Sequence, residues 1–327
     1  MDEVMNRRHF LAMSAGIGAG LNLAFSSRQT ARAAEPAAKG TMKKALIVGE
    51  PKAEELRAFK EAGFDGVEAG IVSVEKAERC RRMAEDIGME IHSVLRGWAQ
   101  FNDPDPAVVA DTFATTEQAL RAAQGYGADA ILLVPCRISG HEMPRAWEFR
   151  YEFDPETGHV EKVTYGDNAP FADYIKAHNH AVDTSREAIE RLIPLAEETG
   201  VVIGIENVWN NLWVRPEIFR HFVESFKSKW VQAYYDIGNH VRYARSTDWI
   251  LELGGLIVKC HVKDFQLNKS DPAGGGAFVN IRDGSINWPS VREALARVGY
   301  DGWMTIEGGD LSPQEHSKRL DLIIAGQ

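Results

Sequence analysis

The chain has 327 residues, and its 37 Lys and Arg against 47 Asp and Glu give a formal net charge of −10. This acidic balance argues against nucleic-acid binding, because a phosphate backbone selects a basic protein surface. The length exceeds that of an average domain, but α/β barrels commonly reach about 250 residues as a single domain.

The N-terminal segment is typical of an export signal. Residues 6–11 read Asn-Arg-Arg-His-Phe-Leu, an apolar run continues to Phe25, and Ala31-Arg32-Ala33 is a small-x-small cleavage site. The run is shorter than the roughly 20 apolar residues of a membrane-spanning helix. We predict a twin-arginine signal peptide over 1–33, a linker over 34–42 and one folded domain over 43–327. The expected partner is the twin-arginine export machinery and the expected location is periplasmic or otherwise exported, with an uncleaved anchor as the alternative.

From Lys43 onward, short apolar runs alternate with longer amphipathic stretches, which is the pattern of repeated βα units. The predicted strands are Ala45–Gly49, Gly66–Ala69, Glu90–Leu95, Ala130–Pro135, Val201–Glu206, Val231–Asp236, Ile257–His261 and Trp303–Glu307. The predicted helices are Lys52–Ala62, Val74–Ile87, Val108–Gln124, Ala172–Thr199, Pro216–Phe226, Thr247–Leu253, Pro289–Val298 and Pro313–Ala325. Eight such pairs, without a Gly-x-Gly-x-x-Gly turn after the first strand, predict a closed (β/α)₈ TIM barrel.

One connection is longer than the others. Between residues 138 and 170, two segments with alternating side chains, 147–153 and 159–165, flank the turn Asp154-Pro-Glu-Thr-Gly158. This predicts a β-hairpin insertion after strand 4. An insertion at this point would stand over the C-terminal face of the barrel, where it could act as a lid; a decorative hairpin or an oligomer contact are the alternatives.

The last four predicted strands all end in a charged or metal-ligating residue: Glu206, Asp236, His261 and Glu307. Singly, such residues are more often helix caps, ion-pair partners or buried core residues. Together, three carboxylates at one pole of a barrel would repel one another, and a bound cation relieves that repulsion. The four residues therefore predict a site for one divalent metal, with Mn²⁺ preferred and Mg²⁺, Co²⁺ or Zn²⁺ as alternatives.

The motifs around these four residues resemble those of the sugar phosphate isomerase/epimerase family of xylose isomerase-like TIM barrels. They are Ile205-Glu206-Asn207, Asp236-Ile-Gly-Asn239, His261-Val-Lys-Asp264 and Ile306-Glu307. The family includes ketose 3-epimerases and L-ribulose-5-phosphate 3-epimerase-type enzymes, and the resemblance runs from about Lys43 to the C-terminus. It implies that Glu206, Asp236, His261 and Glu307 take the metal-ligand positions, and that Glu206 and Glu307 are also the catalytic acid/base pair.

The chain also departs from the better-known epimerases. Those enzymes carry a further Glu shortly after the first ligand and an Arg shortly after the His, whereas these stretches here read Val208-Trp-Asn-Asn-Leu-Trp213 and Phe265-Gln-Leu-Asn-Lys-Ser270. They also often have a substrate-contacting His three residues after the Asp. This chain has Asn239 there, followed by His240, so substrate specificity does not transfer from the resemblance.

Six residues are candidates for substrate binding at the mouth of the barrel, because sugar sites combine aromatic faces with amide and charged hydrogen-bonding groups. They are His92 in the third predicted strand, Trp209, Asn239, His240, Lys263, and Arg282 in the loop 281–284, which is the candidate for binding an anionic substrate group. Structural interpretations stand beside these: Asn239 as a cap, Trp209 as packing and Lys263 as an ion-pair partner of Asp264. On the predicted helix 172–199, His178 and His180 are expected to face solvent.

These features predict a metal-dependent isomerase or epimerase that transfers a proton through an enediolate. Export, and the lack of a clear glycine-rich phosphate cradle after the last two strands, favour an unphosphorylated keto-sugar as substrate. A lyase or hydratase acting on a 3-keto-glycoside is the nearest alternative. A metal-dependent endonuclease and a non-catalytic carbohydrate-binding barrel are weaker ones. The family resemblance adds the expectation of a homodimer.

Overall fold

The computed structural model describes residues 42–268, 270–271 and 275–327. The predicted signal peptide and almost all of the predicted linker therefore lie outside the described residues. Within them, eight parallel strands close into a barrel in the order β1-β12-β9-β8-β7-β4-β3-β2. The part of the chain that the structure describes contains no helix long and apolar enough to span a membrane.

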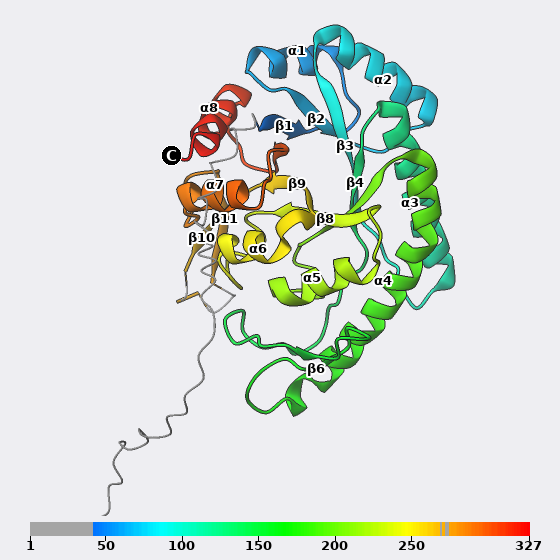
Figure 1. Ribbon diagram of the computed structural model, residues 1–327, viewed down its shortest axis with the longest axis vertical. Coiled ribbons are helices and arrows are strands. Elements are labelled where there is room, and N and C mark those ends of the chain that lie inside the picture. Colours follow the sequence, from blue (N-terminus) through cyan, green and yellow to red (C-terminus); the bar gives the residue numbers. More distant parts are fainter. Residues whose placement is uncertain (1–41, 269, 272–274) are drawn as a thin grey trace, which may run out of the picture. The chain divides into compact units, whose positions relative to one another are not determined.

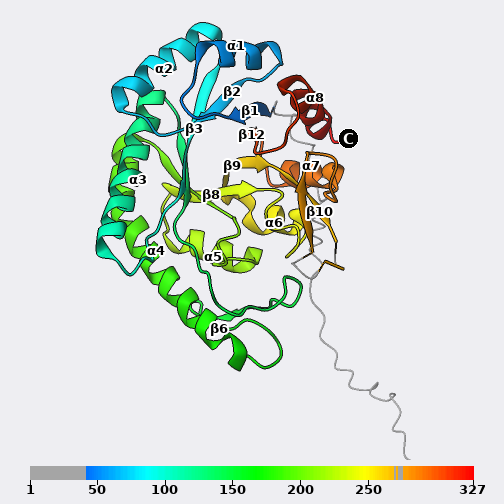
Figure 2. The same ribbon diagram turned by 180° about the vertical axis from the view of Figure 1, so that it is seen from behind.

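The predicted TIM barrel is confirmed, with helices on the outside of the strands (Figures 1 and 2). The barrel strands are β1 (Lys43–Ile47), β2 (Gly66–Ala69), β3 (Glu90–Trp98), β4 (Ala130–Val134), β7 (Val202–Glu206), β8 (Val231–Asp236), β9 (Ile257–Val262) and β12 (Trp303–Ile306). The helices are α1 (Ala53–Glu61), α2 (Val74–Ile87), α3 (Pro106–Tyr126), α4 (Ala172–Thr199), α5 (Pro216–Ser225), α6 (Ser246–Leu253), α7 (Trp288–Arg297) and α8 (Pro313–Ile324), with 3₁₀ turns at η1 (Ala169–Phe171) and η2 (Gly254–Leu256).

Local chemistry explains why the helices end where they do. The side chain of Ser73 accepts a hydrogen bond from the backbone N–H of Lys76 at the start of α2, and Gly88 ends that helix with a φ of 76°. Gly200 ends α4 in the same left-handed conformation, with a φ of 70°. Glycine adopts this conformation without the steric cost that a Cβ would impose, so each helix stops and the chain turns into the next strand.

The parallel register brings the ends of the strands to one pole of the barrel. Asp236 at the end of β8 pairs with His261 of β9, and Ile306 at the end of β12 pairs with Val262. Glu206 ends β7, next to β8 in the sheet. Residues separated by up to about a hundred positions in the sequence are thus placed side by side at the C-terminal face, where barrel enzymes build their active sites.

The predicted hairpin after strand 4 is present as the antiparallel pair β5 (Glu152–Phe153) and β6 (Val160–Lys162). It packs against the N-terminal part of α4: the side-chain amide of Asn179 hydrogen-bonds both the N–H and the carbonyl of Val160, at 2.7 and 3.1 Å. The views agree that β6 lies beside α4 (Figures 1 and 2). The expectation that His178 faces solvent was wrong, because this side of α4 is covered and the imidazole of His178 is fully buried.

A second hairpin, which the sequence analysis did not predict, follows β9. It consists of β10 (Asp264–Leu267) and β11 (Gly276–Val279) in antiparallel pairing. The carboxylate of Asp264 accepts hydrogen bonds from the backbone N–H groups of Arg282 and Gly284 and from the indole N–H of Trp288. Asp264 therefore secures the chain that returns from this hairpin, and the ion pair with Lys263 that the sequence suggested does not form.

Close packing inside the barrel makes a specific stability prediction at Gly66. A Cβ at this position would lie 2.4 Å from the carbonyl oxygen of Glu90 and 2.6 Å from the indole ring of Trp303. We expect Gly66→Ala to lower the free energy of unfolding by about 1–3 kcal/mol, as other overpacking substitutions do. Urea unfolding followed by circular dichroism measures the change.

Gly49→Ala is the matched control, because a Cβ there would meet nothing within 4 Å. Its effect on the free energy of unfolding should stay within about 0.5 kcal/mol. Equal stability of the two variants would contradict the described packing around Gly66.

Candidate metal centre

Four side chains gather at the C-terminal pole of the barrel. Glu206, Asp236, His261 and Glu307 each offer one ligand atom, and these atoms all lie within 4.8 Å of one another. Glu206, Asp236 and His261 are buried, whereas the side chain of Glu307 is 33% exposed. The structure therefore brings the four predicted ligands together as a candidate metal site that opens to solvent on the side of Glu307.

Backbone and amide groups fix the orientation of Asp236. Its Oδ1 accepts hydrogen bonds from the N–H groups of Gly238 and Asn239, at 2.8 and 2.6 Å. The side chain of Asn207 hydrogen-bonds both the N–H and the carbonyl of Asp236. The other carboxylate oxygen, Oδ2, is buried and has no hydrogen-bond partner among the described residues. A buried carboxylate oxygen left without a donor fits the binding of a cation at this place.

The imidazole of His261 connects two carboxylate environments. Its Nδ1 lies 2.9 Å from Oε2 of Glu307 and 3.7 Å from Oε1 of Glu206, so this nitrogen faces the centre of the cluster. Its Nε2 lies 2.6 Å from Oε2 of Glu68, a buried residue of β2 that the sequence analysis missed. Nδ1 is therefore the atom of His261 that is placed to bind a metal.

Two of the predicted substrate-binding residues belong to the same cluster. The ammonium of Lys263 lies 2.8 Å from Oε1 of Glu307, 3.2 Å from Oδ1 of Asn239 and 3.7 Å from Oδ2 of Asp236. The amide of Asn239 in turn donates to Oε1 of Glu206, at 3.2 Å. Lys263 and Asn239 thus bridge the carboxylates and offer hydrogen-bonding groups at the mouth of the barrel.

Trp209 lies at the rim of this cluster. Its indole N–H donates to the carbonyl of Asn239, and its ring packs against Phe265 and Phe278 at centroid distances of 5.8 and 5.0 Å. The guanidinium of Arg242 lies 4.0 Å from the centre of the Trp209 ring. The rim next to the carboxylates is therefore aromatic, as sugar-binding sites often are.

Within the described residues, two other predicted substrate-binding residues, His240 and Arg282, make no polar contact with the four candidate ligands through their side chains. His240 is buried: its Nδ1 lies 3.2 Å from the amide nitrogen of Asn207, and its ring stacks on Trp249. Arg282 has a φ of 74° and donates its backbone N–H to Asp264. Among the described residues, no hydrogen bond or ion pair joins the side chain of His240 or Arg282 to the four candidate ligands.

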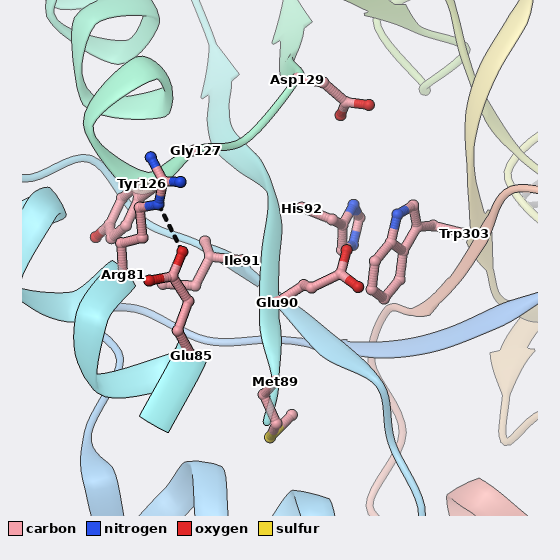
Figure 3. Close-up of a pocket in the computed structure, with 10 residues that line it drawn as sticks. All are labelled: Arg81, Glu85, Met89, Glu90, Ile91, His92, Tyr126, Gly127, Asp129 and Trp303. Carbon is pink, nitrogen blue, oxygen red and sulfur yellow. Dashed lines mark hydrogen bonds and ion pairs between the residues drawn. The ribbon is translucent and has the colours of Figure 1, made fainter. Parts of the chain in front are cut away.

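The structure places His92 near the opposite end of the barrel. His92 lines a pocket of about 170 Å³ together with residues that precede β3 and β4. Its ring stacks on Trp303, with ring centroids 4.2 Å apart (Figure 3). Its Nε2 hydrogen-bonds the hydroxyl of Thr305. The expectation that His92 lines the mouth is corrected, because it lies only two residues after the start of β3 rather than near its end.

Burial and crowding set the charge state of the centre. Burial raises the pKa of Asp236 to about 7 and also raises the pKa of Glu206, and in both cases the charges of neighbouring carboxylates add to the effect. Burial opposes ionisation of Glu307 as well, but hydrogen bonds and charges from His261 and Lys263 lower its pKa. Burial disfavours the cationic form of His261, yet the surrounding carboxylates raise its pKa well above the usual value. A metal cation at this centre would therefore compete with protons for Asp236 and His261.

Comparison with known proteins gives a family match and distant relatives. Residues 56–322 match the family model described as xylose isomerase-like TIM barrel. The L-ribulose-5-phosphate 3-epimerase UlaE of Shigella flexneri serotype 5b is 24% identical over 285 residues, which cover 82% of this chain and 86% of that protein. An uncharacterized protein of Methanocaldococcus jannaschii is 27% identical over 143 residues. The match covers 42% of this chain and 47% of that protein.

A solved structure shares the fold. The apo form of the 3-keto-D-glucoside 4-epimerase YcjR of Escherichia coli superimposes with a TM-score of 0.63 and 16% sequence identity, over 87% of this chain and 100% of that one.

The raised pKa values predict that metal binding displaces protons. Asp236, with a pKa of about 7, and His261, whose pKa is raised, must both be deprotonated to act as ligands. Affinity for Mn²⁺ should therefore rise as the pH increases from about 6 to about 8 and weaken as the pH falls through this range. Calorimetric titration in two buffers of different ionisation enthalpy should detect about one or more protons released per metal ion. An affinity that does not depend on pH would contradict the described charge state.

Proposed function

Because the chain belongs to the xylose isomerase-like TIM barrel family, we propose that it is a metal-dependent isomerase or epimerase that acts on an unphosphorylated keto-sugar through an enediolate. The observation that carries this proposal is the placement of two glutamates on either side of the cluster. In the sheet order, β8 and β9, which carry Asp236 and His261, lie between β7 with Glu206 and β12, which Glu307 follows. A substrate held at Asp236 and His261 would be flanked by the two carboxylates.

The donor set fits a divalent cation with a preference for oxygen ligands, held by Glu206, Asp236, Nδ1 of His261 and Glu307. We favour Mn²⁺ over Mg²⁺, Co²⁺ and Zn²⁺. When bound, the cation would polarise the substrate carbonyl and stabilise the negative charge that develops on the oxygens of the enediolate.

Proton transfer is assigned to the two glutamates. One carboxylate removes the proton from the carbon next to the carbonyl, and the other returns a proton. Return to the same carbon from the opposite face gives epimerisation, and return to the neighbouring carbon gives isomerisation. Lys263 and Asn239 would donate hydrogen bonds to substrate hydroxyls, and Trp209 would contact the sugar through its ring.

A lyase or hydratase acting on a 3-keto-glycoside is a second candidate, which one observation favours. The ammonium of Lys263 lies 2.8 Å from Glu307, so a positive charge and hydrogen-bond donor stands beside the acid/base pair. Such a group would stabilise the negative charge that develops on a β-substituent as it leaves an enediolate, while one of the two glutamates supplies the proton to it. The relative YcjR is a 3-keto-D-glucoside 4-epimerase, so the same fold accommodates a 3-keto-sugar in that protein.

From the sequence of residues 6–33 we also propose that the protein is periplasmic or otherwise exported. An exported enzyme meets free sugars rather than cytoplasmic sugar phosphates, which separates this proposal from the phosphorylated substrate of the relative UlaE. A homodimer stays a prediction.

Export can be tested by replacing Arg7 and Arg8 with Lys in the full chain. In a bacterial host with twin-arginine export, we expect the unchanged protein to appear in the periplasmic fraction as a shortened chain. The variant should stay unprocessed in the cytoplasm, because the export machinery recognises the arginine pair. Immunoblots of fractionated cells measure this, and equal periplasmic levels of both proteins would contradict the proposal.

The chemistry can be tested by hydrogen exchange in D₂O, with unphosphorylated ketoses and 3-keto-glycosides as substrates and NMR as the readout. We expect Mn²⁺-dependent incorporation of deuterium beside the carbonyl. Glu206→Gln and Glu307→Gln should each slow it by about 100-fold or more, because each removes a proton-transfer group. The product identifies epimerisation, isomerisation or elimination.

Glu61→Gln, the same substitution at the exposed end of α1, is the control and should exchange at the unchanged rate. Metal content measured on each variant separates loss of proton transfer from loss of the cation. Substrate binding without exchange, in metal-free and metal-loaded protein alike, would contradict an enzymatic role and support the carbohydrate-binding alternative.

A further inference from the structure

A fully buried carboxylate lies inside the barrel below the candidate metal centre. Glu68 is in the middle of β2, and its side chain accepts hydrogen bonds from the hydroxyls of Ser93 and Tyr234, at 2.9 and 3.1 Å, through Oε1. Its Oε2 lies 2.6 Å from Nε2 of His261. Transfer of a carboxylate from water into an apolar interior is costly, so three converging donors at one buried glutamate need an explanation.

The hydrogen-bond pattern determines which nitrogen of His261 carries a proton. When Glu68 is a carboxylate it has no proton to donate, and in that form Nε2 of His261 donates to Oε2 of Glu68. In a neutral imidazole the lone pair then lies on Nδ1, the nitrogen that faces Glu206 and Glu307. The opposite tautomer would place a proton between His261 and the metal position.

The surroundings of Glu68 hold this arrangement in place. Ser93 and Tyr234 both donate to Oε1, which leaves Oε2 directed at the imidazole. The ring of Tyr234 also packs edge-on against His261, with centroids 4.8 Å apart. Rotation of the imidazole would therefore break the bond to Glu68 and this ring contact together.

We propose that Glu68 is a positioning residue for metal capture, which selects the Nε2–H tautomer of His261 and keeps its Nδ1 directed at the cation. The proposal rests on the metal centre of the proposed function but not on the identity of any sugar. Ligand histidines commonly donate their second nitrogen to a carboxylate, and loss of such a partner typically weakens metal affinity by about 10- to 100-fold.

The first test measures the dissociation constant for Mn²⁺ by electron paramagnetic resonance of the free ion. Glu68→Gln keeps the shape of the side chain but removes its charge, and Glu68→Leu removes the acceptor. We expect affinity to fall by about 10-fold in the first and by up to about 100-fold in the second. Thr199→Val is the control: it also removes a buried hydroxyl, one that bonds to the carbonyl of Leu195 within α4 and away from the candidate ligands, and it should change affinity by less than about 3-fold.

The second test asks whether Glu68 acts through His261. In a His261→Asn background, the additional Glu68→Gln change should weaken Mn²⁺ binding by less than about 3-fold, because the partner it positions is gone. The visible spectrum of Co²⁺-loaded protein, which reports ligand geometry, should change in Glu68→Gln and stay unchanged in Thr199→Val. A role in folding alone would change the melting temperature of metal-free protein and leave the affinity and the spectrum as they were.

Unchanged Mn²⁺ affinity in Glu68→Gln, or an equal loss in the presence and absence of His261, would overturn the proposal. These outcomes are independent of catalysis. Protein that binds Mn²⁺ through Glu68 and His261 but converts no sugar would leave this inference standing and reject the proposed reaction.

Discussion

The parallel register of the closed barrel is the constraint on which the candidate site depends. Because neighbouring strands run in the same direction, the ends of β7, β8, β9 and β12 meet at one pole, although they are far apart in the sequence. Asp236 is paired directly with His261, and Glu307 follows the residue that pairs with Val262. The register therefore concentrates negative charge in a small, largely buried volume, and the rest of the site is organised around that charge.

The charge is offset in two ways that act at different depths. At the mouth, the ammonium of Lys263 lies 2.8 Å from Glu307 and 3.7 Å from Asp236, on a side chain that is 16% exposed. Deeper in the barrel, His261 lies between the cluster and the carboxylate of Glu68. Lys263 and His261 do not satisfy every carboxylate oxygen of the cluster, since Oδ2 of Asp236 has no hydrogen-bond donor among the described residues. A divalent ion would complete this balance, because its charge is compact and can contact several oxygens at once.

The ends of helices and strands are marked by neighbouring residues and could be predicted from the sequence. The level at which a strand residue lies along the barrel axis depends on the pairing of distant strands and could not. Helix α2 (Val74–Ile87) has the predicted bounds because a capping serine and a terminal glycine mark its ends. The four ligands were predicted because strand ends meet at one pole. His92 was assigned to the correct strand, but its level within the barrel follows from the stagger of β3 against its neighbours. Glu68 stands in a four-residue strand that is buried throughout, and its partners Ser93 and His261 lie on other strands.

The carboxylate of Asp264 anchors the β10–β11 hairpin to the barrel, so that the hairpin and the barrel strands can change independently in sequence. The candidate ligands are carried by the barrel strands, whereas Phe278 at the aromatic rim is carried by the β10–β11 hairpin, whose returning chain is secured by Asp264. Replacement of residues between Phe265 and Val279 would alter the shape of the rim while this anchor keeps the loop attached to the barrel. Descendants of such a protein could therefore acquire a differently shaped rim by substitutions in one short hairpin, with the four candidate ligands inherited intact.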